Sequence, residues 1–303
     1  MMDQAEKLRQ VINNLKLKQN MSQKEIANNV GKKAAKVITI TSGKGGVGKT
    51  NITVNLAICL SELGYRVVIL DADFGLANVD VLFGIVPKYT LLDMIENRRN
   101  IFEVLSDGPK NIKFISGGSG VEALVKLEKD QLDKFVSNIA LLDKISDIIL
   151  IDTGAGLSDT VMSFIMAADE VLLVTTPEPT SITDAYALIK MVSNRDRSKK
   201  IKVLVNKAES ASEANDILNK LTLVSEKFLS MKLHSVGFLL HDEMVIKAVK
   251  LQQPFFLSYP KCHAARQIKE VCKELVDSKG NFLDNEVSGI KGFIKKLVNL
   301  MNT

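Results

Sequence analysis

The 303-residue chain contains no tryptophan and only three cysteines, and it lacks any long apolar run. Cys59, Cys262 and Cys272 are odd in number, and their spacing matches no common zinc pattern, even with His263 beside Cys262. We therefore expect reduced thiols in a cytoplasmic protein rather than a disulfide framework. The first residues do not resemble a signal peptide, and no apolar run reaches the ~18 residues of a membrane span. We expect no transmembrane segment.

The net charge of +5 is concentrated at the two ends of the chain. Residues 1–36 carry +5, from eight Lys/Arg against three Asp/Glu, and residues 288–303 carry +3, so residues 37–287 carry −3. A uniformly basic surface would indicate nonspecific binding to nucleic acid. Two basic ends instead predict that the termini contact a partner or an anionic membrane surface. We expect no sequence-specific nucleic-acid binding.

From residue 36 onward, short apolar runs alternate with helical stretches. Near-continuous Ile/Val/Leu runs are typical of strands buried on both faces. Their alternation with helices predicts a three-layer α/β fold, in which helices flank a mostly parallel sheet and ligands bind at the carboxyl ends of the strands. The predicted strands are 36–41, 66–71, 111–116, 147–152, 170–175, 201–206 and 234–240, and the predicted helices lie near 49–63, 121–143, 158–167, 181–194 and 211–230.

A glycine-rich loop follows the first predicted strand and opens the first predicted helix. It matches G-x-x-x-x-G-K-[ST], the P-loop pattern, with Gly43, Lys44, Gly45, Gly46, Val47, Gly48, Lys49 and Thr50, and Asn51 comes next. Glycines let backbone N–H groups point at phosphate oxygens, and the helix start adds partial positive charge. Lys49 can reach the β- and γ-phosphates, and the Thr50 hydroxyl can bind Mg²⁺. The motif predicts a site for ATP or ADP with Mg²⁺.

The second lysine in this loop, Lys44, resembles the deviant P-loop of the MinD/ParA family. In that family the early lysine reaches the nucleotide of a partner subunit, which implies that Lys44 acts in trans in an ATP-dependent homodimer. The stretch from Asp71 to Asp80 resembles the first switch of MinD-like ATPases. The resemblance assigns Asp73 to the attacking water and Asp71 to the magnesium shell. We therefore expect Asp73, Lys44 and Lys49 to be the catalytic residues.

Three further segments at strand ends complete the predicted site. Asp152 ends a buried strand and begins Asp-Thr-Gly-Ala-Gly, which fits a carboxylate that holds Mg²⁺ through water, followed by a switch that senses the γ-phosphate. Asn206-Lys207 resembles the family's adenine-side motif, and Pro177-Glu178 is expected to help form the base pocket. The resemblance covers about residues 36–260. The related nitrogenase iron protein requires cysteines near the switches, and this chain has none there.

The C-terminal segment predicts a basic amphipathic helix. Its apolar residues recur at helical spacing, with lysines on other faces: Ile290, Phe293, Ile294, Leu297, Val298 and Met301 against Lys291, Lys295 and Lys296. Such a helix can lie in a membrane interface or pack on the core of its own domain. MinD-like proteins end in a helix of this kind, which favours the membrane. Both arrangements can alternate, with docking in the absence of ATP and release on dimerisation.

The N-terminal segment resembles a segment that is typical of one subfamily. Asp3-Gln4-Ala5-Glu6-Lys7-Leu8-Arg9 resembles the D-Q-A-x-x-L-R segment of the FlhG subfamily, also called YlxH or FleN, which limits flagellar number. There the segment binds and activates the GTPase FlhF, which implies partner-binding roles for Asp3, Gln4, Leu8 and Arg9. Gln4 is suited to orient a water in the partner's site. An ordinary amphipathic helix packed on its own domain is the alternative.

These features predict three parts: a helical activator arm with a linker (1–35), a MinD-like ATPase domain (36–280) and a membrane-targeting helix (281–303). We expect a slow ATP hydrolase at the inner face of the cell membrane, with FlhF and flagellar switch proteins such as FliM, FliN or FliY as partners. Two alternatives stay open. One is a ParA- or MinD-type ATPase for DNA partitioning or division-site placement. The other is a nonenzymatic adaptor that ATP switches.

Overall fold

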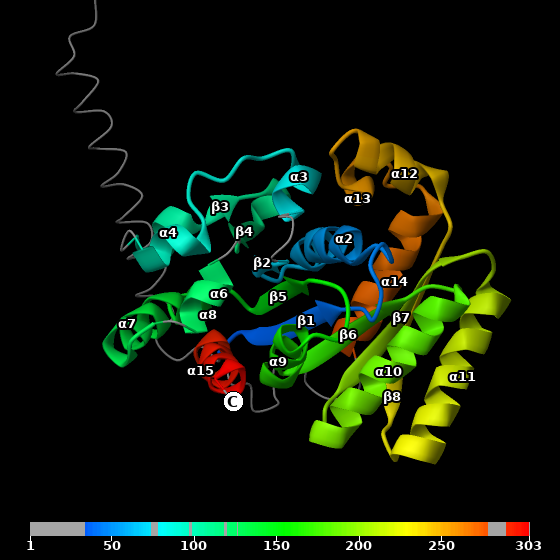
Figure 1. Ribbon diagram of the computed structural model, residues 1–303. Helices are drawn as coiled ribbons and strands as arrows, with labels where there is room; N and C mark the ends of the chain where they lie inside the picture. The colour runs from blue at the N-terminus through cyan, green and yellow to red at the C-terminus, as the bar shows by residue number, and fades with distance from the viewer. Residues whose placement is uncertain are drawn as a thin grey trace, which may run out of the picture.

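The computed structural model describes residues 34–73, 78–96, 99–117, 120–125, 127–277 and 289–302. An eight-stranded sheet forms the middle layer, with the strand order β3-β4-β2-β5-β1-β6-β7-β8. All neighbouring pairs are parallel except β3 and β4. Figure 1 shows the helices packed on both faces of this sheet. The predicted three-layer α/β fold is confirmed.

Four of the eight strands, β1, β2, β5 and β6, are buried along their whole length. The strands are β1 (Lys36–Thr41), β2 (Val67–Ala72), β3 (Ser106–Asp107), β4 (Lys113–Ser116), β5 (Ile148–Thr153), β6 (Glu170–Thr175), β7 (Ile201–Ala208) and β8 (Leu233–Leu240). Successive residues of one strand belong to opposite cores: Ile38 packs in one cluster and Val37 in the other, as strand geometry requires. The predicted strand 111–116 begins only at Lys113, because residues 109–111 form a 3₁₀ turn.

The helices divide between the two faces. One face is covered by α2 (Lys49–Glu62), α3 (Val79–Phe83), α12 (Glu243–Lys250), α13 (Phe255–Ser258) and α14 (His263–Asp277). The other face holds α4 (Leu91–Glu96), α5 (Ile101–Val104), α6 (Gly120–Val125), α7 (Lys129–Ile139), α8 (Leu142–Ile145), α9 (Asp159–Ala167), α10 (Pro179–Arg195), α11 (Ala211–Leu229) and α15 (Gly289–Met301). None of the helices in these ranges is long and apolar enough to span a bilayer.

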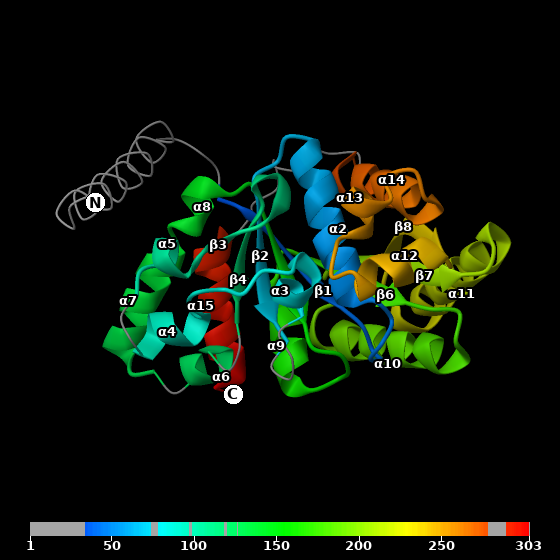
Figure 2. The ribbon, with the colours of Figure 1, turned by 90° about the horizontal axis from the view of Figure 1, so that it is seen from above.

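The prediction of one helix over 121–143 is wrong. The structure has three shorter helices there, α6, α7 and α8. Helix α7 begins after its N-cap, Glu128, and a capping box between Glu128 and Gln131 stabilises this start. The break lets α7 and α8 change direction and pack around α15, which Figure 2 shows between α7 and α9.

The C-terminal helix α15 is part of the core. Ile290, Phe293, Ile294, Leu297 and Val298 are at most 3% exposed, and the Phe293 ring lies 6.1 Å from that of Phe164 in α9. The domain core therefore includes a segment that the sequence pattern set apart. The boundary at residue 281 falls in a stretch outside the described residues.

Candidate nucleotide-binding site

The glycine-rich loop connects the carboxyl end of β1 to the first turn of α2, at the edge of the sheet where the motif places it (Figure 1). Gly46 and Gly48 have φ angles of 76° and 93°, in a region that favours glycine. Gly48 is the N-cap of α2, and no side chain caps this helix. A helix start of this kind carries partial positive charge and backbone donors that suit phosphate oxygens.

Neighbouring elements press closely on this loop. A Cβ on Gly43 would lie 2.5 Å from the backbone carbonyl of Asp184 in α10. A Cβ on Gly48 would lie 2.6 Å from Asn206 Nδ2. The Ser42 carbonyl accepts a hydrogen bond of 3.0 Å from the N–H of Gly156, which ties the loop to the segment after β5. The P-loop is therefore held from three sides.

Lys49 and Asp152 form the buried charged centre of the site. The side chain of Asp152 is fully buried, and Lys49 is 8% exposed. Burial lowers the pKa of Lys49, and the nearby carboxylates of Asp152 and Asp73 oppose that shift. Burial raises the pKa of Asp152 to about 7, and Asp71 adds to this, whereas Lys49 opposes it. A buried lysine between carboxylates at a strand end is a typical arrangement for binding a charged ligand.

The carboxylate of Asp152 fits a magnesium site. Its Oδ1 accepts a hydrogen bond of 3.0 Å from the hydroxyl of Thr53, and the Thr50 hydroxyl lies close enough to the carboxylate to lower its pKa. Its Oδ2 is buried and has no hydrogen-bond partner among the described residues. Mg²⁺ in nucleotide sites is held by one or two protein groups together with phosphates and water. Thr50 and Asp152 would hold it here.

Asp71 shapes the loop that follows β2. Its Oδ2 accepts hydrogen bonds from the N–H groups of Asn78, at 2.9 Å, and Val79, at 3.1 Å, and its Oδ1 accepts one from Asp73 at 3.1 Å. Burial raises the pKa of Asp71 to about 6, and these backbone donors oppose the shift. Backbone N–H groups thus bond to both oxygens of Asp71, which ties residues 73, 78 and 79 to the end of β2.

Asp73 lies beside the loop after β5. A Cβ on Gly154 would lie 3.5 Å from Asp73 Oδ1, and Asp73 is close enough to Lys49 to raise the pKa of that lysine. The structure thus brings the predicted water-positioning carboxylate to the same edge as Lys49 and Asp152. Residues 74–77 lie outside the described ranges.

Lys44 points to the start of α10. Its Nζ lies 2.6 Å from Glu178 Oε2 and donates a hydrogen bond of 2.9 Å to the Thr180 hydroxyl. Glu178 directly follows Pro177, so the segment that was expected at the base pocket binds Lys44 instead. Glu178 is exposed and Lys44 is partly exposed, and a solvated pair of this kind contributes little to stability. Lys44 can therefore leave Glu178 at little cost.

Asn206 and Lys207, at the end of β7, support the P-loop from the other side. Asn206 Nδ2 donates to the Val47 carbonyl and Lys207 Nζ to the Gly46 carbonyl, both at 2.8 Å. Lys207 has a φ of 59°, which costs energy for a residue with a side chain. The motif thus contacts the phosphate loop itself, a role that the sequence pattern did not indicate.

The predicted membrane residues divide between the two faces of α15. Lys291, Lys295 and Lys296 are exposed, whereas the apolar face packs against the domain, with Met301 partly buried. Asp143 in α8 anchors the start of the helix: its Oδ1 accepts from the N–H of Ile290 at 2.9 Å and of Ala35 at 3.1 Å. Docking on the domain, one of the two arrangements considered from the sequence, is the one in this structure.

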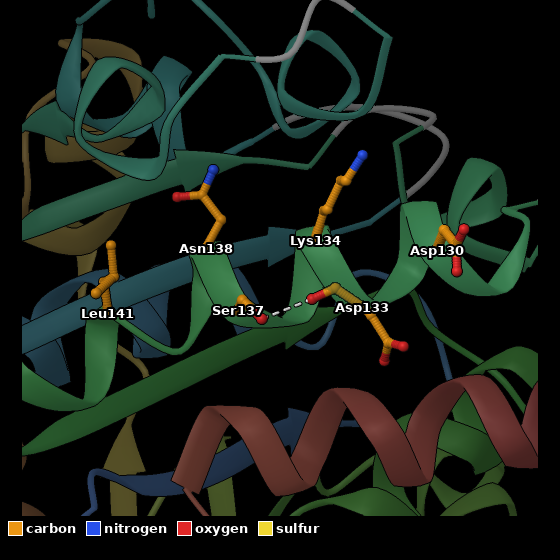
Figure 3. A pocket seen from close by; sticks show the side chains of 6 residues that line it. All are labelled: Asp130, Asp133, Lys134, Ser137, Asn138 and Leu141. Carbon is orange, nitrogen blue, oxygen red and sulfur yellow. Dashed lines mark hydrogen bonds between the residues drawn. The ribbon is translucent and has the colours of Figure 1, made fainter.

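A surface hollow runs along α7 (Figure 3). It is lined by Asp130, Asp133, Lys134, Ser137, Asn138 and Leu141. All six come from α7 and its C-terminal end, beside α15 and away from the P-loop (Figures 1 and 3). The hollow does not belong to the nucleotide site.

The sequence analysis did not single out two residues at this site, Thr53 and Thr180, or Asp143, which anchors α15 away from it. None of the three belongs to a motif, although a hydroxyl one turn after Thr50 could have been noticed. The predicted partner-binding residues Asp3, Gln4, Leu8 and Arg9 lie outside the described residues.

Comparisons with known proteins show what the chain is similar to. Residues 33–276 match the ParA family described as "NUBPL iron-transfer P-loop NTPase". The chain is 45% identical to "Antiactivator FleN" of Pseudomonas aeruginosa over 242 residues, which cover 80% of this chain and 86% of the relative. It is 34% identical to "Flagellum site-determining protein YlxH" of Helicobacter pylori, with 87% and 90% covered.

The fold has relatives among solved structures. MinD in the "MinC:MinD cell division protein complex" of Aquifex aeolicus superposes with a TM-score of 0.63 at 26% identity. The superposition covers 80% of this chain and 96% of that one.

Proposed function

Because the chain belongs to the ParA/MinD family of P-loop ATPases, we propose that it is an ATP-driven regulator of flagellar number or placement, of the FleN/YlxH type. The observation that carries the ATP site is the buried cluster of Lys49 and Asp152 at the P-loop, with Asp152 Oδ2 unpartnered among the described residues. The similarity to FleN and YlxH supports the flagellar assignment.

Each residue of the cluster has a chemical task in this proposal. Backbone N–H groups of the P-loop and Lys49 bind the β- and γ-phosphates. Thr50 and Asp152 hold Mg²⁺, which neutralises phosphate charge when bound. Asp73 orients the water that attacks the γ-phosphate, and its position next to Lys49 and Gly154 supports this role.

Lys44 carries the proposal of an ATP-dependent dimer. In the structure it is tied to Glu178 and Thr180 on the surface. We propose that it exchanges this exposed ion pair for the phosphates of a partner subunit's nucleotide. A charge-assisted bond to phosphate in a closed interface is stronger than a solvated ion pair, so the exchange favours the dimer.

Membrane association depends on α15 in this proposal. Its lysines are exposed while it is docked, and its apolar face is buried. We propose that the ATP-bound dimer releases two such helices to the anionic inner face of the cell membrane. One helix binds lipid weakly, whereas two on one dimer bind with avidity.

Steady-state phosphate release tests the enzyme and the membrane together. We expect slow hydrolysis that anionic vesicles alter, and Lys49→Ala should abolish ATP binding. Retention of ATP by Lys49→Ala, or no binding by the wild type, would overturn the site. ATP-dependent retention on DNA that falls steeply with salt would instead indicate a partitioning ATPase. ATP binding with no measurable hydrolysis would indicate a nucleotide-switched adaptor.

The N-terminal arm is proposed to deliver Gln4 to FlhF, while the ATPase domain controls when the arm is presented at the flagellar switch proteins. The test is GTP hydrolysis by FlhF with a peptide of residues 1–20. We expect stimulation that Gln4→Ala abolishes and Gln10→Ala, outside the D-Q-A-x-x-L-R segment, preserves. Equal stimulation by both variants would remove the role of Gln4. No stimulation by the wild-type peptide would remove the arm's assignment.

A further inference from the structure

Thr53 is a buried hydroxyl in the helix that the P-loop opens. It lies one turn after Thr50 on α2, is fully buried, and is surrounded along the helix by apolar residues such as Ile52 and Val54. Its Oγ1 lies 3.0 Å from the Lys49 carbonyl and 3.0 Å from Asp152 Oδ1. The hydroxyl has one proton to donate, and the carboxylate of Asp152 is a stronger acceptor than the Lys49 carbonyl. We therefore take Asp152 Oδ1 as the main acceptor, with the carbonyl four residues back as the alternative.

Two hydroxyl groups interact with the Asp152 carboxylate, those of Thr50 and Thr53. Thr50 is the group expected to bind Mg²⁺, which leaves Thr53 to orient the carboxylate when the ion is bound. The carboxylate torsion of an aspartate is broad, with two nearly equivalent settings. A donor on one oxygen makes the two oxygens different, because the bonded oxygen is fixed and the other must point away from the donor. Thr53 bonds to Oδ1, and Oδ2 has no hydrogen-bond partner in the part of the chain that the structure describes.

An unpartnered buried carboxylate oxygen destabilises a protein unless a ligand engages it. The Asp152 carboxylate also interacts with Thr50 and Lys49, the groups that are expected to face a nucleotide. The free oxygen is therefore the one available to a hydrated cation.

We propose that Thr53 is a positioning residue for Mg²⁺: its hydroxyl fixes Asp152 Oδ1 so that Oδ2 is presented to the ion's hydration shell. The inference rests on the ATP site proposed above. Thr53 touches neither nucleotide nor metal in this proposal and acts only through Asp152. Partners in the second shell of metal sites change metal affinity by about 10- to 100-fold. We expect about tenfold here, because Asp152 holds the ion through water.

The experiment compares Thr53→Val with Thr53→Ser in the full chain. Binding of a fluorescent ADP is measured against Mg²⁺ concentration and in EDTA. We expect Thr53→Val to raise the Mg²⁺ concentration at half effect about tenfold, while ADP affinity in EDTA stays unchanged. Thr53→Ser retains the hydroxyl and should restore the wild-type midpoint. Should the valine variant fail to fold, Thr53→Ala provides the same comparison.

A matched control is Thr39→Val. Thr39 is an equally buried threonine in β1, and its hydroxyl donates to the Phe164 carbonyl on the far side of the sheet. We expect this variant to lose stability without any change in the Mg²⁺ midpoint. A Thr53→Val midpoint equal to the wild type, or a Thr53→Ser midpoint as high as that of Thr53→Val, would overturn the role of Thr53. Absence of ADP binding by the wild-type protein would instead overturn the nucleotide site.

Discussion

Replacing Asp143 with alanine should loosen the docked C-terminal helix. The Asp143 carboxylate holds the first turn of α15 through Ile290 N–H and the start of β1 through Ala35 N–H. Gly289, with a φ of 65°, leaves no room for a Cβ, which would lie 2.7 Å from Asp143 Oδ2. The anchor is therefore fitted closely to the helix start.

The size of the effect follows from two contributions. The five buried apolar side chains of α15 would cost roughly 7–15 kcal/mol if they were exposed to water, at about 1.5–3 kcal/mol each. Release into water is therefore negligible, and the helix leaves only for another apolar environment such as a bilayer. Transfer of α15 from the domain core to a bilayer changes the burial of its apolar face little. The hydrogen bonds of Asp143 therefore determine the equilibrium between docked and membrane-bound helix. A hydrogen bond to a charged acceptor contributes about 2 kcal/mol, or roughly a 30-fold shift.

Co-sedimentation with anionic phospholipid vesicles measures this shift. We expect Asp143→Ala to reach half-binding at roughly 30-fold less lipid than the wild type in the absence of ATP. Asp143→Asn keeps an acceptor oxygen and should shift binding much less. Asp216→Ala makes the same change of net charge at an exposed position of α11, which packs in a different core cluster from α15, and should leave binding unchanged. Equal lipid dependence of Asp143→Ala and Asp216→Ala would refute the anchoring argument.

Two further predictions concern the nucleotide site. Lys44→Ala should abolish the ATP-dependent dimer but leave the unfolding temperature close to that of the wild type, because the Lys44–Glu178 pair is solvated. Light scattering with a nonhydrolysable ATP analogue and thermal unfolding measure the two effects. Asp152→Asn should stabilise the nucleotide-free protein at pH 8 but not at pH 4. The folded pKa of about 7 exceeds the ordinary 3.8, so the stability that the neutral form contributes is complete below pH 3.8 and is lost as the pH rises through 7. The increase in the free energy of unfolding has an upper limit of about 4 kcal/mol. If the stability of Asp152→Asn varied with pH as that of the wild type does, the prediction would be contradicted.

The strands and the P-loop were predictable because each depends on local sequence. β1, β5 and β6 are near-continuous Ile/Val/Leu runs. A strand of this kind can be predicted without knowing which elements pack on it, because both of its faces are buried. The break of 121–143 into three helices depends on the capping of α7 by Glu128 and Gln131 and on packing around α15. Helical periodicity alone does not carry that information.

The candidate site shows the same division. Lys49, Thr50 and Asp152 belong to motifs whose residue types follow from phosphate and magnesium chemistry. Asp71 was expected at the magnesium shell, yet backbone N–H groups from residues 73, 78 and 79 occupy its carboxylate. Thr53 and Asp143 act on groups 99 and 147 residues away in the chain. Only the folded arrangement brings such pairs together.

The position of α15 restricts how nucleotide could release it. The anchor at Asp143 lies where β1 begins, and the P-loop lies where β1 ends, about 20 Å away for a six-residue strand. Nucleotide therefore cannot touch the anchor. Helix α9 starts just after the loop that follows Asp152, and its Phe164 packs against Phe293 of α15. For the proposed ATP-dependent release of α15, we therefore expect the packing between α9 and α15 to change, because α9 connects the loop after Asp152 to α15.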